Sequence, residues 1–530
     1  MFYLKIHYFP IVKINIANIY MHACYFFCKL CGKIFIEMSK FVIALDQGTT
    51  SSRAVLFDDK GNCLAIKQKE FRQIFPKQAW VEHDPKEIWE SQEAVLKEIL
   101  SLPEVKLGKI LAMGITNQRE TTVIWDRNTG EPIYNALVWQ DKRTASICED
   151  LRRQGLTEYC KENTGLVIDS YFSGTKIKWI LDYVEGAREK AEKGDLCFGT
   201  IDTWLLWNLS KGAIHATDYS NASRTLIYNI KELKWDEKML EALQIPRAIL
   251  PEVKDSASYF GVYESAGVSI PIAAMIGDQQ SALFGQACFE KGMAKNTYGT
   301  GCFLLMNTGA EIKDSPSGLL NTIAWGVDGK ITYALEGSVF IAGAAIQWLR
   351  DGLQIIECAR DTEVIAEATE DKDVYVVPAF AGLGTPYWDM YSRGAIFGLT
   401  RDTGKDHIIK ATLESLAYQS KDVLDAMQKD SGIRLKKMQV DGGACANNYL
   451  MQFQADLLDV DIERPDIVES TATGVAYLAA YTVGLWSLEE INKKRKINKV
   501  FSPQKEDAWR KIKSKRWYEA VKRTMNWENA

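Results

Sequence analysis

Two apolar runs joined by a turn rich in glycine and hydroxyl groups occur once in each half of the chain. The first turn, DQGTTSS at 46–52, lies between the apolar runs 41–45 and 53–57, and the second is GTG at 299–301. Apolar runs that meet at a short polar turn predict β-hairpins. Each half of the chain is therefore expected to contain a hairpin whose turn carries glycine and threonine.

Helical patterns follow both hairpins. Residues 85–100 and 408–427 carry apolar side chains near helical spacing. Strands that alternate with such helices predict an α/β fold. The chain has 530 residues, which is enough for two sizeable domains at about 150 residues each. We expect the boundary between them near residues 286–293.

Residues 1–37 differ in composition from the rest of the chain. They contain no arginine and a single acid, Glu37, while 22 of them are Phe, Ile, Lys, Asn or Tyr. Polar residues interrupt their apolar stretch, which disfavours a secretory signal. We expect a start assigned too far upstream, with the functional protein beginning at Met38. The alternative is a zinc site, although ligands this close together leave little chain to surround a tetrahedral ion. Its candidate ligands are His22, Cys24, Cys28 and Cys31.

Charge balance and cysteine content exclude several classes of function. With 64 Lys and Arg against 69 Asp and Glu, the net charge is −5, which gives no broad basic surface for nucleic acid. Eleven cysteines scattered over a long chain are typical of reduced thiols and predict a cytoplasmic protein. No unbroken apolar run reaches the roughly 18 to 20 residues of a membrane-spanning helix. We expect neither a nucleic-acid partner nor insertion into a membrane.

The two hairpin turns have the chemistry of phosphate-binding loops. Glycine lets backbone N–H groups approach an anion, and threonine and serine hydroxyls add further donors. Asp46, at the end of the first strand, has the oxygen ligands that a hydrated Mg²⁺ prefers. Taken singly, each glycine is also explained by the positive φ that a turn requires.

A third glycine-rich turn, VDGGA at 440–444, precedes a helical pattern. A strand, turn and helix with paired glycines suits close backbone approach to an adenosine, although packing against a sheet also explains Gly442 and Gly443. No Walker loop or GxGxxG motif precedes a helix, which disfavours the P-loop and Rossmann classes. Three such loops can surround one nucleotide.

The order of the three loops resembles that of the actin-like sugar kinases. Four further segments resemble the FGGY carbohydrate kinases: the first three resemble the members that phosphorylate glycerol, and the fourth resembles the second signature of the family. These segments are GITNQRETT at 114–122, residues 163–181, GDQQ at 277–280 and residues 394–414. The resemblance extends from about Ser39 to about Trp527, so only the leading segment is uncovered.

The resemblance implies two ribonuclease H-like domains of the actin-like ATPase type around a central cleft. The N-terminal FGGY domain, residues 38–288, would bind the polyol and carry the first phosphate loop. The C-terminal FGGY domain, residues 289–530, would bind ATP. The implied reaction is in-line transfer of the γ-phosphoryl group of ATP to glycerol, giving sn-glycerol 3-phosphate, with Mg²⁺. The same resemblance implies a homo-oligomer, either a dimer or a tetramer.

The resemblance also implies roles for individual residues. Asp278 would be the general base, and Asp46 would lie behind the metal. The glycerol contacts would be Arg119, Glu120, Trp139, Tyr171, Asp278, Gln279 and Phe303. The ATP contacts would be Thr49, Thr50, Ser51, Arg53, Thr300, Gly343, Gln347, Gly443 and Asn447.

These roles agree with the chemistry, because a small neutral triol must be held by paired donors and acceptors in a mostly dry pocket. Structural explanations remain for several of the same residues. They are a surface ion pair for Arg119 and Glu120, core packing for Trp139 and Phe303, and a cap for a helix beginning near Gln280 for Asp278.

Two other functions stay open. A few side chains set substrate specificity, so the chain could be an FGGY kinase of another polyol or ketose. It could also be a non-enzymatic actin-like ATP-binding module. Arg119, Glu120 and Asp278 argue against the second alternative, because a module without chemistry needs neither a polyol-binding pair nor a base.

Overall fold

The computed structural model describes residues 39–265, 267–466 and 469–529. The segment 1–37 and its alternative zinc ligands lie outside the described residues. Within the described part of the chain, no helix is long and apolar enough to cross a membrane.

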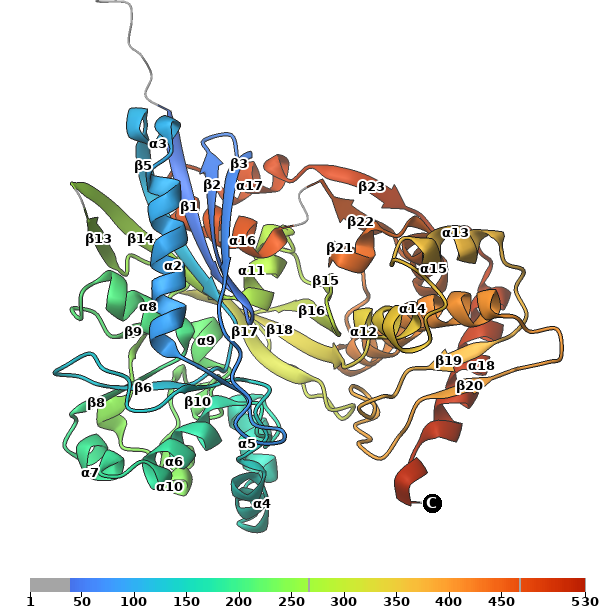
Figure 1. Cartoon of the computed structure of the whole chain (residues 1–530), viewed down its shortest axis with the longest axis horizontal. Helices are drawn as coiled ribbons and strands as arrows, with labels where there is room; N and C mark the ends of the chain where they lie inside the picture. Colours follow the sequence, from blue (N-terminus) through green and yellow to red (C-terminus); the bar gives the residue numbers. More distant parts are fainter. Residues whose placement is uncertain (1–38, 266, 467–468, 530) are drawn as a thin grey trace, which may run out of the picture.

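Two mixed β-sheets form the centres of the two halves (Figure 1). The first has the order β13-β14-β5-β1-β2-β3, and the second has the order β17-β18-β16-β15-β21-β22-β23. The strands of the first sheet are β1 (Lys40–Gln47), β2 (Ser51–Asp58), β3 (Cys63–Glu70), β5 (Lys109–Asn117), β13 (Gly261–Ser265) and β14 (Val268–Gly277). Those of the second are β15 (Met293–Tyr298), β16 (Cys302–Gly309), β17 (Leu320–Val327), β18 (Lys330–Val339), β21 (Lys437–Gly442), β22 (Ile462–Pro465) and β23 (Ile497–Phe501).

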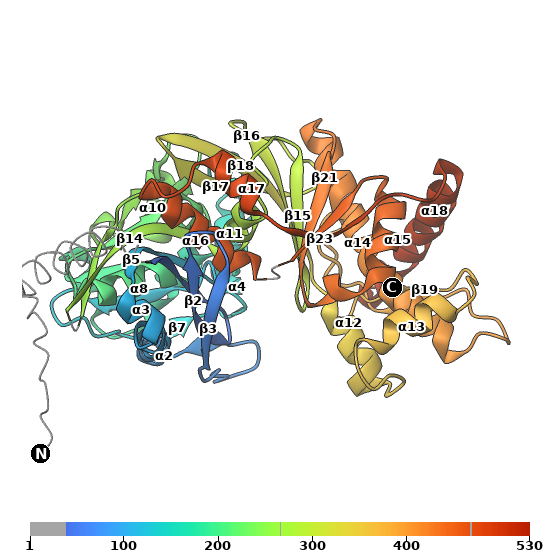
Figure 2. The ribbon, with the colours of Figure 1, turned by 90° about the horizontal axis from the view of Figure 1, so that it is seen from above.

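Helices and short strands complete both halves, and Figure 2 shows two lobes, with α16 and α17 in the lobe of the first sheet. In the first half these are β4 (Glu82–His83), α2 (Pro85–Leu100), α3 (Pro103–Leu107), β6 (Val123–Asp126), β7 (Ala136–Leu137), α4 (Ala145–Arg153), α5 (Thr157–Thr164), α6 (Ser173–Tyr183), α7 (Ala187–Glu192), β8 (Leu196–Gly199), α8 (Ile201–Leu209), β9 (Ala216–Asp218), α9 (Tyr219–Ala222), β10 (Tyr228–Asn229), β11 (Lys234–Trp235), α10 (Glu237–Leu243), β12 (Glu252–Lys254) and α11 (Asp278–Gly285). In the second half they are α12 (Gly343–Gln347), α13 (Asp361–Ala368), β19 (Tyr375–Val377), β20 (Ala395–Phe397), α14 (Lys405–Ser431), α15 (Asn448–Leu458), α16 (Ser470–Thr482), α17 (Leu488–Lys494) and α18 (Asp507–Thr524).

Both expected hairpins are present and have the same surroundings. β1 pairs antiparallel with β2 and parallel with β5, and β15 pairs antiparallel with β16 and parallel with β21. In the first sheet Asp46 is paired with Thr116, and Asn117 with Gly277. Because parallel strands end at the same edge of a sheet, the segments that follow β1, β5 and β14 meet there. The expected α/β class is confirmed.

The predicted helices are also present. The first matches α2, which starts from the Asp84 N-cap and a proline at its first turn. The second is longer than predicted, since α14 extends to Ser431 and ends at Gly432 with a φ of +67°.

One helix of the second half returns to the first sheet. α16 packs against α11 and against β1, β5 and β14. The two helices approach so closely that a Cβ at Gly474 would lie 1.8 Å from the backbone oxygen of Ser281. This contact brings the second half directly behind the edge where the site residues gather.

Candidate active site

Asp46 is buried at the end of β1, beside the first turn. Its Oδ2 lies 3.7 Å from Arg53 Nη1, which also donates to Glu469 Oε2 at 2.9 Å. Burial raises the pKa of Asp46 to about 7, opposed by Arg53 and reinforced by the carboxylates of Asp278 and Glu469. The carboxylates of Asp46, Asp278 and Glu469 outnumber Arg53 here, which fits a hydrated divalent cation. Because no set of three or more His, Cys, Asp or Glu side chains in the described residues could hold a metal, such a cation would need phosphate oxygens as well.

Asp278 is the first residue of α11, and Gly277 occupies the N-cap position. The expectation of a cap for a helix beginning near Gln280 is therefore wrong. The Asp278 Oδ1 accepts the N–H of Gln279 at 2.7 Å and lies 3.2 Å from Arg119 Nε. Its side chain is 29% exposed, so the carboxylate is accessible from one side. Burial raises the pKa of Asp278, although Arg119 and Lys295 pull in the opposite direction.

Arg119 and Glu120 follow β5 and are buried, so the explanation as a surface ion pair is wrong. Arg119 Nη1 donates to Glu336 Oε2 at 2.5 Å and to Gln280 Oε1 at 3.2 Å, and Nη2 donates to Glu336 Oε1 at 3.2 Å. A guanidinium has five N–H donors. Beyond these three hydrogen bonds to described residues, one Nη2–H and the Nε–H next to Asp278 remain for an oxygen of a bound polyol.

Two charged residues that contact Arg119 and Glu120 were not predicted from the sequence. Arg224 and Glu336 are both fully buried. Arg224 Nε donates to Glu120 Oε1 at 2.6 Å, and Arg224 Nη2 donates to Glu336 Oε1 at 2.8 Å. The available signal was the lone acid in the strand ITYALEGSV, because a fully buried glutamate is rare without a partner. We call Arg119, Glu120, Arg224 and Glu336 the clamp network.

Trp139, Tyr171 and Phe303 form an aromatic wall beside the clamp network. The Trp139 ring centroid lies 5.6 Å from that of Tyr171 and 6.4 Å from that of Phe303, both edge to face. Trp139 Nε1 also donates to Thr49 Oγ1 at 3.1 Å, which joins the wall to the first turn. All three rings are only partly buried, so core packing does not explain Trp139 and Phe303. The wall combines apolar faces from both halves of the chain.

Gln279 is oriented by a buried lysine. Lys295 Nζ donates to Gln279 Oε1 and, at 2.7 Å, to Thr297 Oγ1. With its oxygen engaged in this way, the Gln279 amide offers its NH₂ group as the donor to a ligand. Burial lowers the pKa of Lys295 to about 8, and Asp441 and Asp278 limit the decrease.

The predicted phosphate contacts of the first turn lie at different depths. Thr50 is exposed and Thr49 half-buried, whereas Ser51 is buried at the start of β2. Ser51 Oγ accepts from Gln68 Nε2 at 3.2 Å. Of the three hydroxyls, those of Thr49 and Thr50 are therefore better placed for a ligand.

The second turn lies against the start of α12. Thr300 is exposed, and its backbone oxygen accepts the N–H of Ala344 at 3.1 Å. Gly343 donates its N–H to the Gly299 oxygen at 3.0 Å, and a Cβ at Gly343 would lie 2.5 Å from that oxygen. Gln347 is exposed at the end of the same helix. Close packing of loop on helix thus requires glycine at position 343.

The two adjacent glycines of the third turn have different surroundings. Gly442 has a φ of +83°, and a Cβ there would lie 2.2 Å from the Tyr298 oxygen, so packing explains it. A Cβ at Gly443 would meet nothing within 4 Å, so packing against the protein does not explain the glycine at this position. Asn447 caps α15 through the N–H of Leu450 at 2.9 Å and donates to Thr362 Oγ1 at 3.1 Å.

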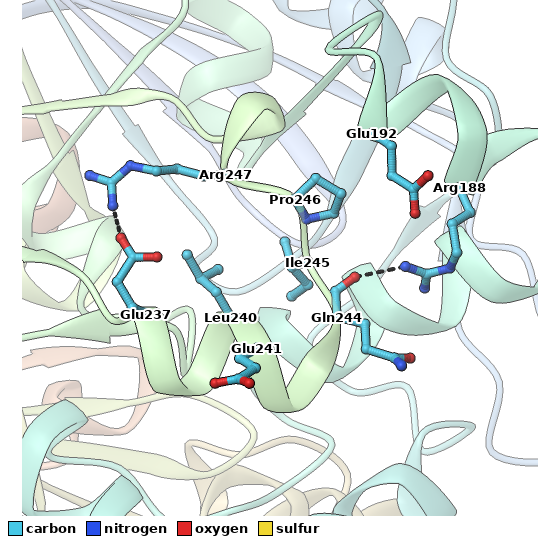
Figure 3. Close-up of a pocket in the computed structure, with 9 residues that line it drawn as sticks. All are labelled: Arg188, Glu192, Glu237, Leu240, Glu241, Gln244, Ile245, Pro246 and Arg247. Carbon is cyan, nitrogen blue, oxygen red and sulfur yellow. Dashed lines mark hydrogen bonds and ion pairs between the residues drawn. The ribbon is translucent and has the colours of Figure 1, made fainter.

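The hollow drawn in Figure 3 lies elsewhere in the first half. It is lined by residues of α7, α10 and the segment after α10, including Arg188, Glu237 and Arg247. None of the predicted site residues contributes to it. The candidate active site is therefore defined by the converging side chains and not by this surface hollow.

The chain is similar to known carbohydrate kinases over most of its length. Residues 41–285 match the N-terminal domain of the FGGY family of carbohydrate kinases, and residues 294–483 match its C-terminal domain. A glycerol kinase of Alkaliphilus metalliredigens is 62% identical over 496 residues, covering 93% of this chain and 99% of that protein. A glycerol kinase of Caldanaerobacter subterraneus is 62% identical over 494 residues, covering 92% and 99%.

Solved structures extend the comparison. The crystal structure of Plasmodium falciparum glycerol kinase with ADP has a TM-score of 0.88 at 38% identity and covers 92% of this chain and 98% of that one. A gluconate kinase from Lactobacillus acidophilus has a TM-score of 0.82 at 22% identity over 92% and 97% of the two chains, which shows the fold alone. Because both domain matches and the high-identity relatives agree, the chain belongs to the FGGY family of carbohydrate kinases.

Proposed function

We propose that this protein transfers the γ-phosphoryl group of ATP to glycerol, forming sn-glycerol 3-phosphate and ADP. The relatives named glycerol kinase, at 62% identity over most of the chain, support this substrate. The observation that carries the proposal is the 3.2 Å separation between Arg119 Nε and Asp278 Oδ1. At this separation one substrate hydroxyl can accept a hydrogen bond from the Arg119 guanidinium and donate its proton to the Asp278 carboxylate.

Asp278 is the general base in this proposal. As the hydroxyl oxygen bonds to the γ-phosphorus and the bond to the β,γ-bridging oxygen breaks, Asp278 accepts the hydroxyl proton. The raised pKa of Asp278 favours this step, because a stronger base accepts a proton more readily near neutral pH. Arg119, Glu120 and Gln279 hold the polyol, while Trp139, Tyr171 and Phe303 pack against its carbon atoms and exclude water.

The phosphate groups of ATP lie between the two hairpin turns in this proposal. Thr49, Thr50 and Thr300 supply hydroxyl and backbone donors, and Arg53 supplies positive charge. Ser51 contributes through its backbone, because its side chain is buried against Gln68. Phosphoryl transfer depends mainly on positioning and charge neutralisation, which these groups provide.

The nucleotide base and ribose lie against the second half of the chain. Gly343 and Gln347 of α12 form one side, and Gly443 and Asn447 of the third turn form the other. Gly443 supports this placement because no packing requirement accounts for a glycine there. Mg²⁺ is the proposed cation, held beside Asp46 and the phosphates, and when bound it neutralises charge on the β- and γ-phosphoryl oxygens.

The expected organisation stays part of the proposal. The domains are residues 38–288 and 289–530, and the protein acts in the cytoplasm as a homo-oligomer, either a dimer or a tetramer. The eight cysteines of the described residues are all free, as in a reducing compartment. Light scattering coupled to size-exclusion chromatography measures the oligomeric state directly.

The test is to incubate the protein with Mg-ATP and, separately, glycerol, xylulose, gluconate or no acceptor, and to measure ADP release. Glycerol-dependent ADP release with stoichiometric sn-glycerol 3-phosphate is the expected result. Preference for a ketose or sugar acid would indicate another FGGY kinase activity. ATP binding without transfer to any acceptor would favour the non-enzymatic module.

A further inference from the structure

The clamp network is a closed chain of buried charges. Glu336 accepts from Arg119 through both carboxylate oxygens, at 2.5 and 3.2 Å, and its Oε1 also accepts from Arg224 Nη2 at 2.8 Å. Arg224 Nε then donates to Glu120 Oε1 at 2.6 Å. Two arginines and two glutamates cancel in charge, which is the condition under which buried ions are tolerated. Each member therefore depends on the others for its position.

Glu336 is the member of the clamp network that comes from the second half of the chain. Arg119, Glu120 and Arg224 all belong to the first half, whereas Glu336 is on β18 of the second sheet. The arginines lower the pKa of Glu336 to about 2 despite its burial, so it is ionised at any working pH. A permanent carboxylate of the second half thus aligns two cations of the first.

The bidentate contact determines which donors of Arg119 face the polyol. Two parallel N–H···O bonds fix the plane and rotation of a guanidinium, which a single contact does not. With Glu336 on Nη1 and Nη2, the Nε–H edge is turned toward Asp278. Arg224 links Glu336 to the second polyol contact, because its Nη2 donates to Glu336 and its Nε donates to Glu120.

We propose that Glu336, acting with Arg224, is a positioning residue for polyol binding, which holds the Arg119 guanidinium and the Glu120 carboxylate in the orientation that receives the substrate. This inference builds on the proposed glycerol kinase activity and names residues outside the predicted contact set. Glu336 touches no substrate; it acts through Arg119 directly and through Glu120 by way of Arg224.

The test is the Glu336→Gln variant of the full-length protein. The amide keeps the shape of the side chain but replaces one acceptor oxygen with an NH₂ group that faces an arginine donor. We expect the KM for glycerol to rise at least about tenfold, the change that about 1.4 kcal/mol of lost binding produces. The KM for ATP is expected to stay within about twofold, because uniform loss of polyol binding appears in the polyol KM.

Glu463→Gln is the matched control. Glu463 is also a buried glutamate of the second sheet, held by Lys437 at 2.9 Å and Arg495 at 2.5 Å, but it lies on β22 away from the clamp network. Its substitution is expected to lower the melting temperature and leave the glycerol KM unchanged. Equal effects of the two variants on the glycerol KM would overturn the proposal.

Glu336→Asp decides the matter if Glu336→Gln does not fold. Aspartate keeps the charge but is one methylene shorter, so it cannot reach both arginines with the same geometry. We expect a raised glycerol KM and a smaller thermal shift on adding glycerol, with an unchanged shift on adding ADP. If Glu336→Asp has the same glycerol KM as the unmodified protein, the positioning role is refuted and the proposed function is not. If the unmodified protein does not phosphorylate glycerol, the proposed function and this inference are both refuted.

Discussion

Replacing Asp278 with asparagine tests the centre of the proposed chemistry. Asparagine keeps the size of the side chain, and its carbonyl oxygen can still accept the Gln279 N–H that Asp278 accepts at 2.7 Å. It cannot accept the proton of the glycerol hydroxyl. The substitution therefore removes the base while it retains most of the local structure.

The role of Asp278 sets the expected change in kcat, and its contacts set the expected change in stability. General-base catalysis contributes about 10² to 10⁴ in rate, so kcat is expected to fall by that factor, or about 2.7 to 5.5 kcal/mol in barrier. Arg119 keeps its two bonds to Glu336, and burial already favours the neutral form of Asp278. The melting temperature near neutral pH is therefore expected to stay the same or rise slightly.

The assay follows ADP release at saturating Mg-ATP over a range of glycerol concentrations and pH. The wild-type kcat/KM is expected to fall as the pH decreases through the raised pKa of Asp278, because protonation removes the base. This acid limb is expected to be absent from the small residual activity of the variant. The glycerol KM is expected to change by no more than a few fold.

Asp84→Asn is the matched control, because Asp84 is a true N-cap that accepts the Lys86 N–H at 2.9 Å. Asparagine and aspartate cap helices about equally well, so this variant is expected to keep full turnover. Near-normal kcat in Asp278→Asn would refute the assignment of Asp278 as the base. A low kcat with a large fall in melting temperature would contradict the structural part of the reasoning.

Three further substitutions test other parts of the site. Arg119→Gln is expected to raise the glycerol KM by about tenfold or more and to leave the ATP KM nearly unchanged, since loss of a buried charge partner costs about 2 to 5 kcal/mol; an unchanged glycerol KM would place the polyol elsewhere. Asp46→Asn is expected to raise the melting temperature of the ligand-free protein at pH 8 more than at pH 5. Its folded pKa of about 7 lies above the ordinary value of 3.8, so the charged form is destabilising above pH 7 and the cost disappears as the pH falls and the group is protonated; equal shifts at the two pH values would argue against a buried charge. Gly443→Ala is expected to raise the ATP KM without a change in melting temperature, because its Cβ meets no protein atom within 4 Å; a wild-type ATP KM would exclude close approach of the nucleotide at this turn.

The local sequence pattern was sufficient to predict the hairpins and the helix near the candidate active site. The two hairpins and α2 follow from alternating apolar runs, polar turns and a helix cap, all of which involve neighbours in the chain. The motifs resembling FGGY kinases supplied the set of candidate residues, since each is a short contiguous segment. The sequence could not separate Gly442 from Gly443, because their different surroundings depend on the Tyr298 oxygen of another strand.

Only the tertiary structure decided how the charged side chains are paired. From the residues alone, a surface ion pair was the favoured interpretation of Arg119 and Glu120. Arg224 and Glu336 were not predicted, because a local sequence pattern does not identify partners more than 100 residues away. The edge where β1, β5 and β14 end brings Asp46, Arg119 and Asp278 together, and the contact of β18 with the first half adds Glu336. Buried charges are stable only in such completed sets, so the identity of the partners is a property of the folded arrangement and not of any single segment.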